Sequence, residues 1–311
     1  MALTVAQAFD QFKSRLELNQ SFQDAVTTHH NAIRSWIESY STNIKTQLIG
    51  SLQRKTRIPP RPNGDTFDID ILIVLGSFAR WVPFVGISPT LALKEVEHIV
   101  AQNETYERMG PETDSPAIIV EYQDDIKIEL IPAYVDQVGY APNGTPTPPV
   151  GRGYWIPKNN RWVLADYDYD AYYISEANKG IGGYLIPTIK MLKSAKRNLF
   201  QDMQSYHLEL LATSIIPHTI KYFKEQRWQI SYPWLVYYFF LVCKDEILKE
   251  VNIPGSKSSP ADGYMTLVRK QEISRLFNKI ASHCKTTFSI NDKDAIPAWN
   301  KLFSVPFPSG T

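Results

Sequence analysis

The spacing of apolar residues along the chain changes near residue 170. Before that point, apolar and polar residues alternate in several short stretches, which is typical of β-strands. We expect one strand in "TFDIDILIVL" (66–75), two strands joined by a tight turn at 123–125 in "PAIIVEYQDDIKIELIPAYV" (116–135), and a short strand or hairpin in "YWIPKNNRWVLADY" (154–167). Beyond residue 170, apolar residues recur every three or four positions. This spacing predicts helices over 171–180, 183–199, 204–224, 231–250, 264–285 and 291–303.

The N-terminal pattern is helical. Residues 4–49 carry apolar positions at mixed three and four spacing, with a break at 19–21 that divides them into two helices. Gly50 and Ser51 are expected to end the second helix and to open a Pro-rich loop. Ser88 and Pro89 suit a helix N-cap and first turn, so another helix is expected over 88–103. Loops are expected at 142–153 and 253–263, which are rich in Pro, Gly or Ser.

These elements predict an α+β fold with a mixed β-sheet. The first lobe would span 1–170, including the N-terminal helices, and a helical lobe would span 171–311, with a cleft between the two. The 311 residues are 43% hydrophobic, which allows a large core. Lys and Arg number 33 against 32 Asp and Glu, so the net charge of +1 argues against a protein that coats DNA or a membrane surface.

Cysteine content and hydropathy bear on the cellular compartment. Cys243 and Cys284 lie far apart in the sequence, so a disulfide framework is not expected and a reducing compartment fits. The first residues carry charges early and show no signal-peptide core, and the most apolar later run is too short to span a bilayer. We therefore expect a soluble, cytoplasmic protein.

Two aspartates interrupt an otherwise apolar strand. Side chains alternate across a strand, so Asp68 and Asp70 point to one face. In "IKIEL" (126–130), Lys127 and Glu129 likewise share a face. If the two strands are neighbours, Glu129 joins the two aspartates, and three carboxylates on one face repel each other without a cation. Mg²⁺ takes hard oxygen ligands and accepts substrate phosphates, so the pattern predicts a site for two Mg²⁺ ions, with Mn²⁺ as a substitute.

A simpler interpretation of these residues exists. Asp-x-Asp is a common pattern, and most examples are solvated residues of edge strands. Lys127 beside Glu129 gives a surface ion pair of little energetic value. We favour the metal site because the strand is so apolar, because a Gly-Ser turn precedes it, and because a second strand carries a carboxylate.

The order of the motifs adds specificity. Gly50 allows close backbone approach, and Ser51 offers a hydroxyl and an N–H to a phosphate. "GS", then Arg54-Lys55-Thr56, "DID" and "IELIPAY" resemble the DNA polymerase β-like nucleotidyltransferases. "YWIPKNNRWVLAD", "EANKGIGGYLIPTIKMLKSAKR" and "QSYHLELLA" are similar to the bacterial cGAS/DncV-like nucleotidyltransferases (CD-NTases) of CBASS anti-phage systems, relatives of animal cyclic GMP-AMP synthase and oligoadenylate synthetase. The similarity runs from about residue 50 to residue 212.

This resemblance implies roles for individual residues. Asp68 and Asp70 would bind both metal ions, and Glu129 would be the third ligand and would help to activate the acceptor hydroxyl. Ser51, beside Gly50, would hold the donor triphosphate. The helical lobe would be oligoadenylate synthetase-like. Its Lys193 would contact the donor phosphates, with Lys190 as the weaker choice. Ser205 would contact the triphosphate, and Tyr206 would stack on the donor base. Both lysines could instead solvate a helix face, and Tyr206 could be a packing residue.

The resemblance also implies an activity and partners. The enzyme would be a Mg-dependent nucleotidyltransferase that makes a cyclic di- or trinucleotide second messenger from NTPs, ATP among them, and releases pyrophosphate. Its product would activate an effector, and a CBASS accessory protein is a conceivable partner. The tail "KLFSVPFPSGT" is expected to be exposed and frayed, although partner conjugation there is conceivable. His283 and Cys284 stand alone, so no DNA-sensing zinc insertion is expected.

Two other functions stay open. A linear nucleotidyltransferase would tail RNA or modify a small molecule, but a long RNA substrate favours a basic groove that the composition does not indicate. A nucleotide-binding scaffold without catalysis is the third alternative. The intact set of Asp68, Asp70 and Glu129 argues against it.

Overall fold

The computed structural model describes residues 3–61, 64–79, 86–136, 153–254, 256–303, 305 and 307–309. The chain divides into two compact units. The sheet unit comprises 19–173 and 254–258, and the helical unit comprises 1–18, 174–253 and 259–311. The boundary lies close to the expected one at 170, but residues 1–18 belong to the helical unit and not to the first lobe, where we had placed the N-terminal helices. The loop expected at 142–153 lies almost wholly outside the described residues.

The sheet unit is built on a mixed sheet. Its seven described strands follow the order β1-β2-β5-β4-β3, with β6 pairing β5 and β7 pairing β6. β2 and β5 run parallel, and every other pair is antiparallel. The strands are β1 Lys45–Leu48, β2 Phe67–Ser77, β3 Glu112–Asp114, β4 Ala117–Glu121, β5 Ile126–Val135, β6 Tyr154–Lys158 and β7 Arg161–Ala165. The expected strands and the turn at 123–125 are confirmed, because Asp125 adopts the positive φ of a tight turn.

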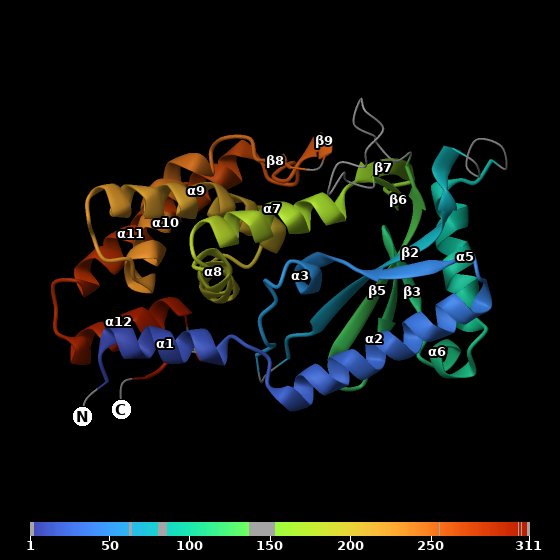
Figure 1. Ribbon diagram of the computed structural model, residues 1–311, viewed down its shortest axis with the longest axis horizontal. Coiled ribbons are helices and arrows are strands. Elements are labelled where there is room, and N and C mark those ends of the chain that lie inside the picture. Colours follow the sequence, from blue (N-terminus) through green and yellow to red (C-terminus); the bar gives the residue numbers. More distant parts are fainter. Residues whose placement is uncertain are drawn as a thin grey trace. The chain divides into compact units, whose positions relative to one another are not determined.

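Helices of the sheet unit pack beside the strands. α2 (Gln20–Tyr40) and α5 (Pro89–Ala101) pack with each other and against strands of the sheet (Figure 1), and the short α6 (Glu104–Arg108) follows α5. The Ser88 hydroxyl accepts a hydrogen bond from the Leu91 N–H, so the predicted N-cap is confirmed. The break predicted at 19–21 is also confirmed, because α2 begins at Gln20 with Asn19 as its cap.

The segment before Asp68 differs from the prediction. Residues 45–48 were predicted to be helical, but they form β1 and pair with Ile71–Val74 of β2. Tertiary pairing here overrides a weak helical pattern. Gly50 and Ser51 do not end a helix. They begin the short helix α3 (Gly50–Gln53), which directly follows β1.

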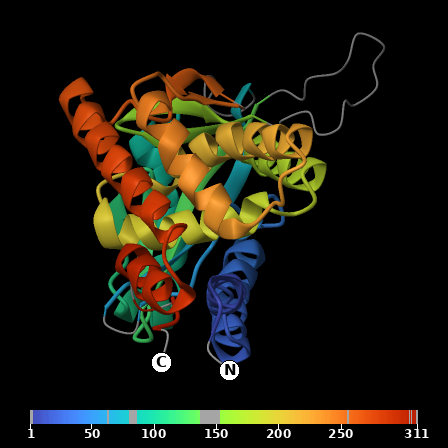
Figure 2. The ribbon, with the colours of Figure 1, turned by 90° about the vertical axis from the view of Figure 1, so that its left-hand side faces the viewer.

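The helical unit contains α1 (Val5–Arg15) and five helices from the second half of the chain, which can be followed in yellow to red in Figure 2. These are α8 Leu185–Leu199, α9 Ser205–Glu225, α10 Tyr232–Glu246, α11 Leu267–Thr287 and α12 Asp292–Phe303. α7 (Tyr167–Gly180) begins in the sheet unit and ends in the helical unit. All six predicted helices are confirmed. The loop expected at 253–263 instead contains strand β9 (Ser256–Pro260), which pairs with β8 (Asn252–Ile253).

Aromatic residues from both ends of the sequence form one cluster. Phe9 and Phe12 of α1 contact Phe303 of α12, and Phe9 also contacts Trp299, with ring centroids 4.5–5.7 Å apart. Phe307 joins them, 5.2 Å from Phe9 and 5.1 Å from Phe12, and it is only 2% exposed. The expectation of a frayed tail is therefore wrong as far as Phe307, because burial of its ring anchors the segment.

Two further expectations concern cysteines and membranes. Cys243 and Cys284 are both buried free thiols, and His283 hydrogen-bonds to the Ala298 carbonyl, so these residues pack the helical unit as expected. Within the described ranges, no helix combines the length and the apolar content that a bilayer crossing requires.

Candidate active site

The parallel pairing of β2 with β5 assembles the predicted carboxylates. Asp68 lies opposite Lys127 and Asp70 lies opposite Glu129 in the register, so all four side chains share one face. The Lys127 ammonium is 3.2 Å from Asp68 Oδ1 and 2.7 Å from Glu129 Oε1. The predicted grouping of three carboxylates is thus confirmed. The ion pair considered as an alternative is also present, and it extends to a second carboxylate.

Asp70 carries the electrostatic cost of this grouping. Burial raises its pKa to about 6, and the charges of Glu129 and Asp68 act in the same direction. Arg54 and Lys127 oppose the rise. Near neutral pH, Asp70 is therefore largely ionised.

Gly50 lies directly against Asp70. The Ile49 N–H donates a hydrogen bond to the Asp70 carbonyl at 3.0 Å, which fixes the entry to α3 beside β2. Gly50 has a φ of +67°, and a Cβ at this position would lie 1.9 Å from Asp70 Oδ2. Only glycine fits both the backbone conformation and the space. The backbone at Gly50 thus lies close to another group, as expected, and that group is the carboxylate of Asp70. Ser51 follows in the first turn of α3.

Three further residues of this site were not predicted from the sequence to be functional. Arg54, at the end of α3, and Tyr167, at the start of α7, interact electrostatically with Asp70, and Asp170 of α7 interacts with Tyr167. The pKa of Tyr167 is raised by burial and by the charges of Asp70 and Asp170, and Arg54 lowers it. Asp170 is buried. The run "ADYDYDAY" (165–172), with three aspartates at alternate positions, was the available signal in the sequence.

Asp168 holds α3 in place. Its Oδ1 accepts hydrogen bonds from the side-chain amides of Gln47 and Gln53, at 2.5 and 2.8 Å, and its Oδ2 accepts one from the Tyr154 hydroxyl at 3.2 Å. These partners come from β1, α3 and β6. One carboxylate therefore ties four elements together around the short helix that carries Gly50 and Ser51.

The residues predicted in the helical unit have their own surroundings. The Lys190 ammonium is 2.5 Å from Glu17, and the Lys193 ammonium is 2.5 Å from Glu209. The Lys193 side chain is 7% exposed and that of Glu209 is fully buried, so this lysine lies inside the helical unit with its charge paired. Ser205 is the exposed first residue of α9, and Tyr206 is half-buried beside it. Their nucleotide-binding roles stay predictions.

The donor set suits a hard divalent cation, since carboxylate oxygens are the preferred ligands of Mg²⁺. As the side chains stand, however, no three Asp, Glu, His or Cys residues among those described are arranged to bind one metal ion. The ammonium of Lys127 contacts two of the three carboxylates, Asp68 and Glu129. The carboxylate chemistry of the three residues fits a divalent cation.

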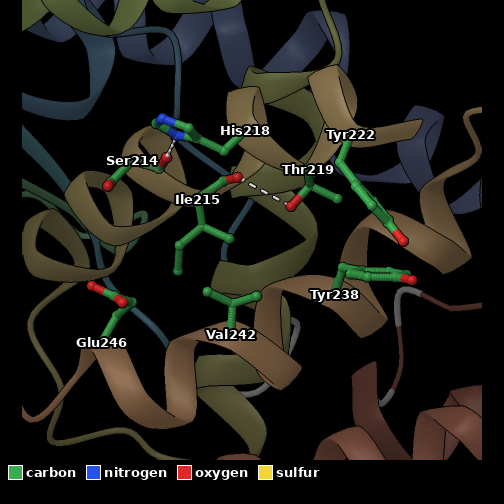
Figure 3. Close-up of a pocket in the computed structure, with 8 residues that line it drawn as sticks. All are labelled: Ser214, Ile215, His218, Thr219, Tyr222, Tyr238, Val242 and Glu246. Carbon is green, nitrogen blue, oxygen red and sulfur yellow. Dashed lines mark hydrogen bonds between the residues drawn. The ribbon is translucent and has the colours of Figure 1, made fainter. Parts of the chain in front are cut away.

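A pocket of about 440 Å³ lies elsewhere, between α9 and α10 of the helical unit (Figure 3). Tyr222 and Tyr238 line one side, and Ile215 and Val242 lie between them and Glu246. The His218 ring donates a hydrogen bond to the Ser214 carbonyl at 2.7 Å. None of the residues predicted for the active site lines this pocket.

Comparison with solved structures identifies the class of fold. Vibrio cholerae DncV, a di-nucleotide cyclase solved with GTP and 5MTHFGLU2, has a TM-score of 0.73 at 12% identity, over 100% of this chain and 98% of that one. CdnC of E. coli MS115-1, solved with ATP, has a TM-score of 0.69 at 13% identity, over 97% and 98%. Escherichia coli DncV bound to 3'-deoxy GTP has a TM-score of 0.64 at 16% identity, over 86% and 72%. The chain therefore has the α+β fold of the polymerase β-like nucleotidyltransferases.

Sequence comparison adds a family-model match over the first part of the chain. Residues 3–146 match the family model of the Second Messenger Oligonucleotide or Dinucleotide Synthetase domain, SMODS. The matched segment contains Gly50, Asp68, Asp70 and Glu129. The resemblance of the chain to the bacterial cGAS/DncV-like nucleotidyltransferases is thus confirmed. No curated protein matches the chain in sequence.

Proposed function

We propose that the protein is a cyclic oligonucleotide synthase that joins NTPs, ATP among them, into a cyclic di- or trinucleotide second messenger. The single observation that carries this proposal is the set of three carboxylates beside Gly50, on paired strands of the segment that matches the SMODS family model. The names of similar structures agree, since they include a di-nucleotide cyclase, a cyclic AMP-GMP synthase and a complex with a linear pppA(3',5')pG intermediate.

The proposed chemistry is repeated phosphodiester formation, with two rounds for a cyclic dinucleotide and three for a cyclic trinucleotide. In each round, a ribose hydroxyl attacks an α-phosphorus, the bond from that phosphorus to the bridging oxygen of the β-phosphate breaks, and pyrophosphate leaves. The hydroxyl proton passes to a carboxylate oxygen of Glu129. The last round joins the two ends of the linear intermediate into a ring. Positioning and charge neutralisation supply most of the rate in such transfers.

Asp68, Asp70 and Glu129 would hold two divalent cations, Mg²⁺ or Mn²⁺. When bound, such ions neutralise charge that develops on the phosphate oxygens and the leaving group. Gly50 keeps α3 tight against Asp70, and the Ser51 hydroxyl and N–H would bind the donor triphosphate. Lys193, Ser205 and Tyr206 would contribute phosphate contacts and base stacking from the helical unit.

The cellular role is proposed by analogy. A cyclic oligonucleotide has no evident use except as a signal, so we place an effector downstream, within a cytoplasmic anti-phage response of the CBASS type. An accessory protein is part of this proposal, because a similar enzyme, E. coli CdnC, was solved as a complex named CdnC:HORMA-deltaN.

The test is an incubation of the full chain with all four radiolabelled NTPs and Mg²⁺ or Mn²⁺, followed by phosphatase and mass spectrometry. A small phosphatase-resistant product, lost in the Asp68→Asn/Asp70→Asn variant, is the expected result. Long labelled RNA would instead establish a tailing enzyme. A scaffold would be favoured if no product formed even with an accessory protein supplied, while the unmodified protein and the Asp68→Asn/Asp70→Asn variant both still bound nucleotide.

A further inference from the structure

Lys127 lies among the carboxylates of the site and has no role in the proposed chemistry. It comes from β5, two positions before Glu129, and the register places it opposite Asp68. Its side chain is 20% exposed, and its ammonium contacts Asp68 and Glu129 together. Lys127 therefore bridges the two strands that supply the carboxylates.

The ammonium is firmly charged in this position. Burial works against the charge, but the hydrogen bonds and charges of Glu129 and Asp68 outweigh it and raise the pKa of Lys127. The ammonium of Lys127 thus neutralises part of the negative charge that Asp68 and Glu129 bring to this face of the sheet.

A divalent cation that binds Asp68 or Glu129 meets this ammonium. Both are cations that need the same carboxylate oxygens, and like charges at contact distance in a half-buried site repel strongly. Unlike an ion from solution, Lys127 is tethered 3.2 Å or less from its two acceptors, so its effective concentration there is high. A metal ion must displace it.

We propose that Lys127 is a displaceable counter-ion that holds the carboxylates together without metal and keeps metal affinity low until a nucleotide triphosphate arrives. The triphosphate brings its own oxygen ligands and negative charge, which tips the exchange toward the divalent cation. Lys127 is in these terms a positioning residue that couples metal entry to substrate binding. The inference rests on the proposed function only for the identity of the metal ligands.

The test measures Mn²⁺ binding to the full chain by electron paramagnetic resonance, first without nucleotide and then with a non-hydrolysable ATP analogue. Lys127→Gln removes the charge and keeps a polar side chain. We expect nucleotide-free Mn²⁺ affinity to rise about tenfold, the scale on which neighbours of metal ligands change affinity. The gain should shrink when the analogue is present. Adding Glu129→Gln to the variant should abolish the gain.

Two controls keep the inference falsifiable. Lys158→Gln removes an exposed lysine of the same unit, at the end of β6, and should leave Mn²⁺ affinity unchanged. Lys127→Arg keeps the positive charge, so its Mn²⁺ affinity should stay at or below that of the unmodified protein, and it serves as the test if Lys127→Gln does not fold. Equal Mn²⁺ affinity in the Gln, Arg and unmodified proteins would overturn the inference.

A second readout separates charge pairing from mere packing. In EDTA, Lys127→Gln should lower the unfolding temperature. Added Mn²⁺ should then raise the unfolding temperature of the variant by more than it raises that of the unmodified protein.

The outcomes also distinguish this inference from the proposed function. Normal product formation with unchanged Mn²⁺ affinity in Lys127→Gln sinks this inference alone. Absence of Mn²⁺ binding in every variant, with and without the ATP analogue, refutes both this inference and the proposed metal ligands.

Discussion

The Cα of Gly50 lies so close to Asp70 that a methyl group on it would sit 1.9 Å from the carboxylate oxygen Oδ2. A side chain at Gly50 must push either α3 or the Asp70 carboxylate out of place. We predict that Gly50→Ala lowers synthase activity about a hundredfold, the loss expected when a catalytic group is misplaced by about 1 Å. Initial rates of cyclic product formation measure this effect.

Gly110 provides the matched control for that substitution. Its φ of +65° nearly equals the +67° of Gly50, but a Cβ at Gly110 meets nothing within 4 Å. Gly110→Ala should therefore cost only the backbone term of about 1–2 kcal/mol in the free energy of unfolding and leave activity intact. If both variants lost activity equally, the contact between Gly50 and Asp70 would not be the cause.

Asp70 should limit the stability of the fold at neutral pH. Its pKa is about 6 in the folded protein against an ordinary value of 3.8. Ionisation of Asp70 above pH 6 therefore destabilises the folded state relative to the unfolded state. Asp70→Asn should raise the free energy of unfolding by about 1–3 kcal/mol at pH 7.5 while abolishing synthesis. As the pH drops from 6 toward 3.8, the Asp70 carboxyl becomes protonated first in the folded and then in the unfolded protein. The stability advantage of Asp70→Asn should therefore fade over this pH range. Urea unfolding at several pH values checks this, and a gain that grows on acidification would contradict it.

The buried pair of Lys193 and Glu209 should matter for stability in its own right. Glu209→Gln leaves an ammonium inside the helical unit without its carboxylate, which should cost about 3–5 kcal/mol in the free energy of unfolding. The double variant Lys193→Met/Glu209→Leu removes both charges and should cost less. Glu176→Gln, in an exposed pair with Lys179, is the control and should cost under about 1 kcal/mol. If Lys193→Met weakened nucleotide binding but left the free energy of unfolding unchanged, the result would support the role of Lys193 in phosphate binding and contradict its role in stability.

The aromatic cluster makes the end of the described chain part of the core. Phe307→Ala should destabilise the protein by about 3 kcal/mol, as other Phe-to-Ala changes in cores do. Val305, two residues earlier and 70% exposed, is the comparison, and Val305→Ala should stay within about 0.5 kcal/mol. Thermal unfolding of the two variants tests this prediction. An equal loss of stability in both variants would mean that the tail is not anchored through Phe307.

The predictable parts of the site are those that depend on short-range periodicity. Alternation alone placed Asp68 with Asp70 and Lys127 with Glu129, and a glycine before the strand indicated a close backbone approach. β1 was missed because Lys45–Leu48 shows no clear apolar alternation, and its strand conformation comes from pairing with β2. Tyr167 comes close to Asp70 only because the start of α7, about a hundred residues later in the sequence, returns to the sheet. Long-range packing of that kind leaves no local pattern.

The cluster of Phe9, Phe12, Trp299, Phe303 and Phe307 has a consequence for protein synthesis. During translation α1 emerges before α12 and Phe307, because nearly the whole sheet unit lies between them in the sequence. Residues 19–173 supply most of the sheet unit, so most of this unit can fold while the aromatic side chains of α1 are still exposed to solvent. These exposed side chains are a target for chaperones until α12 has been made.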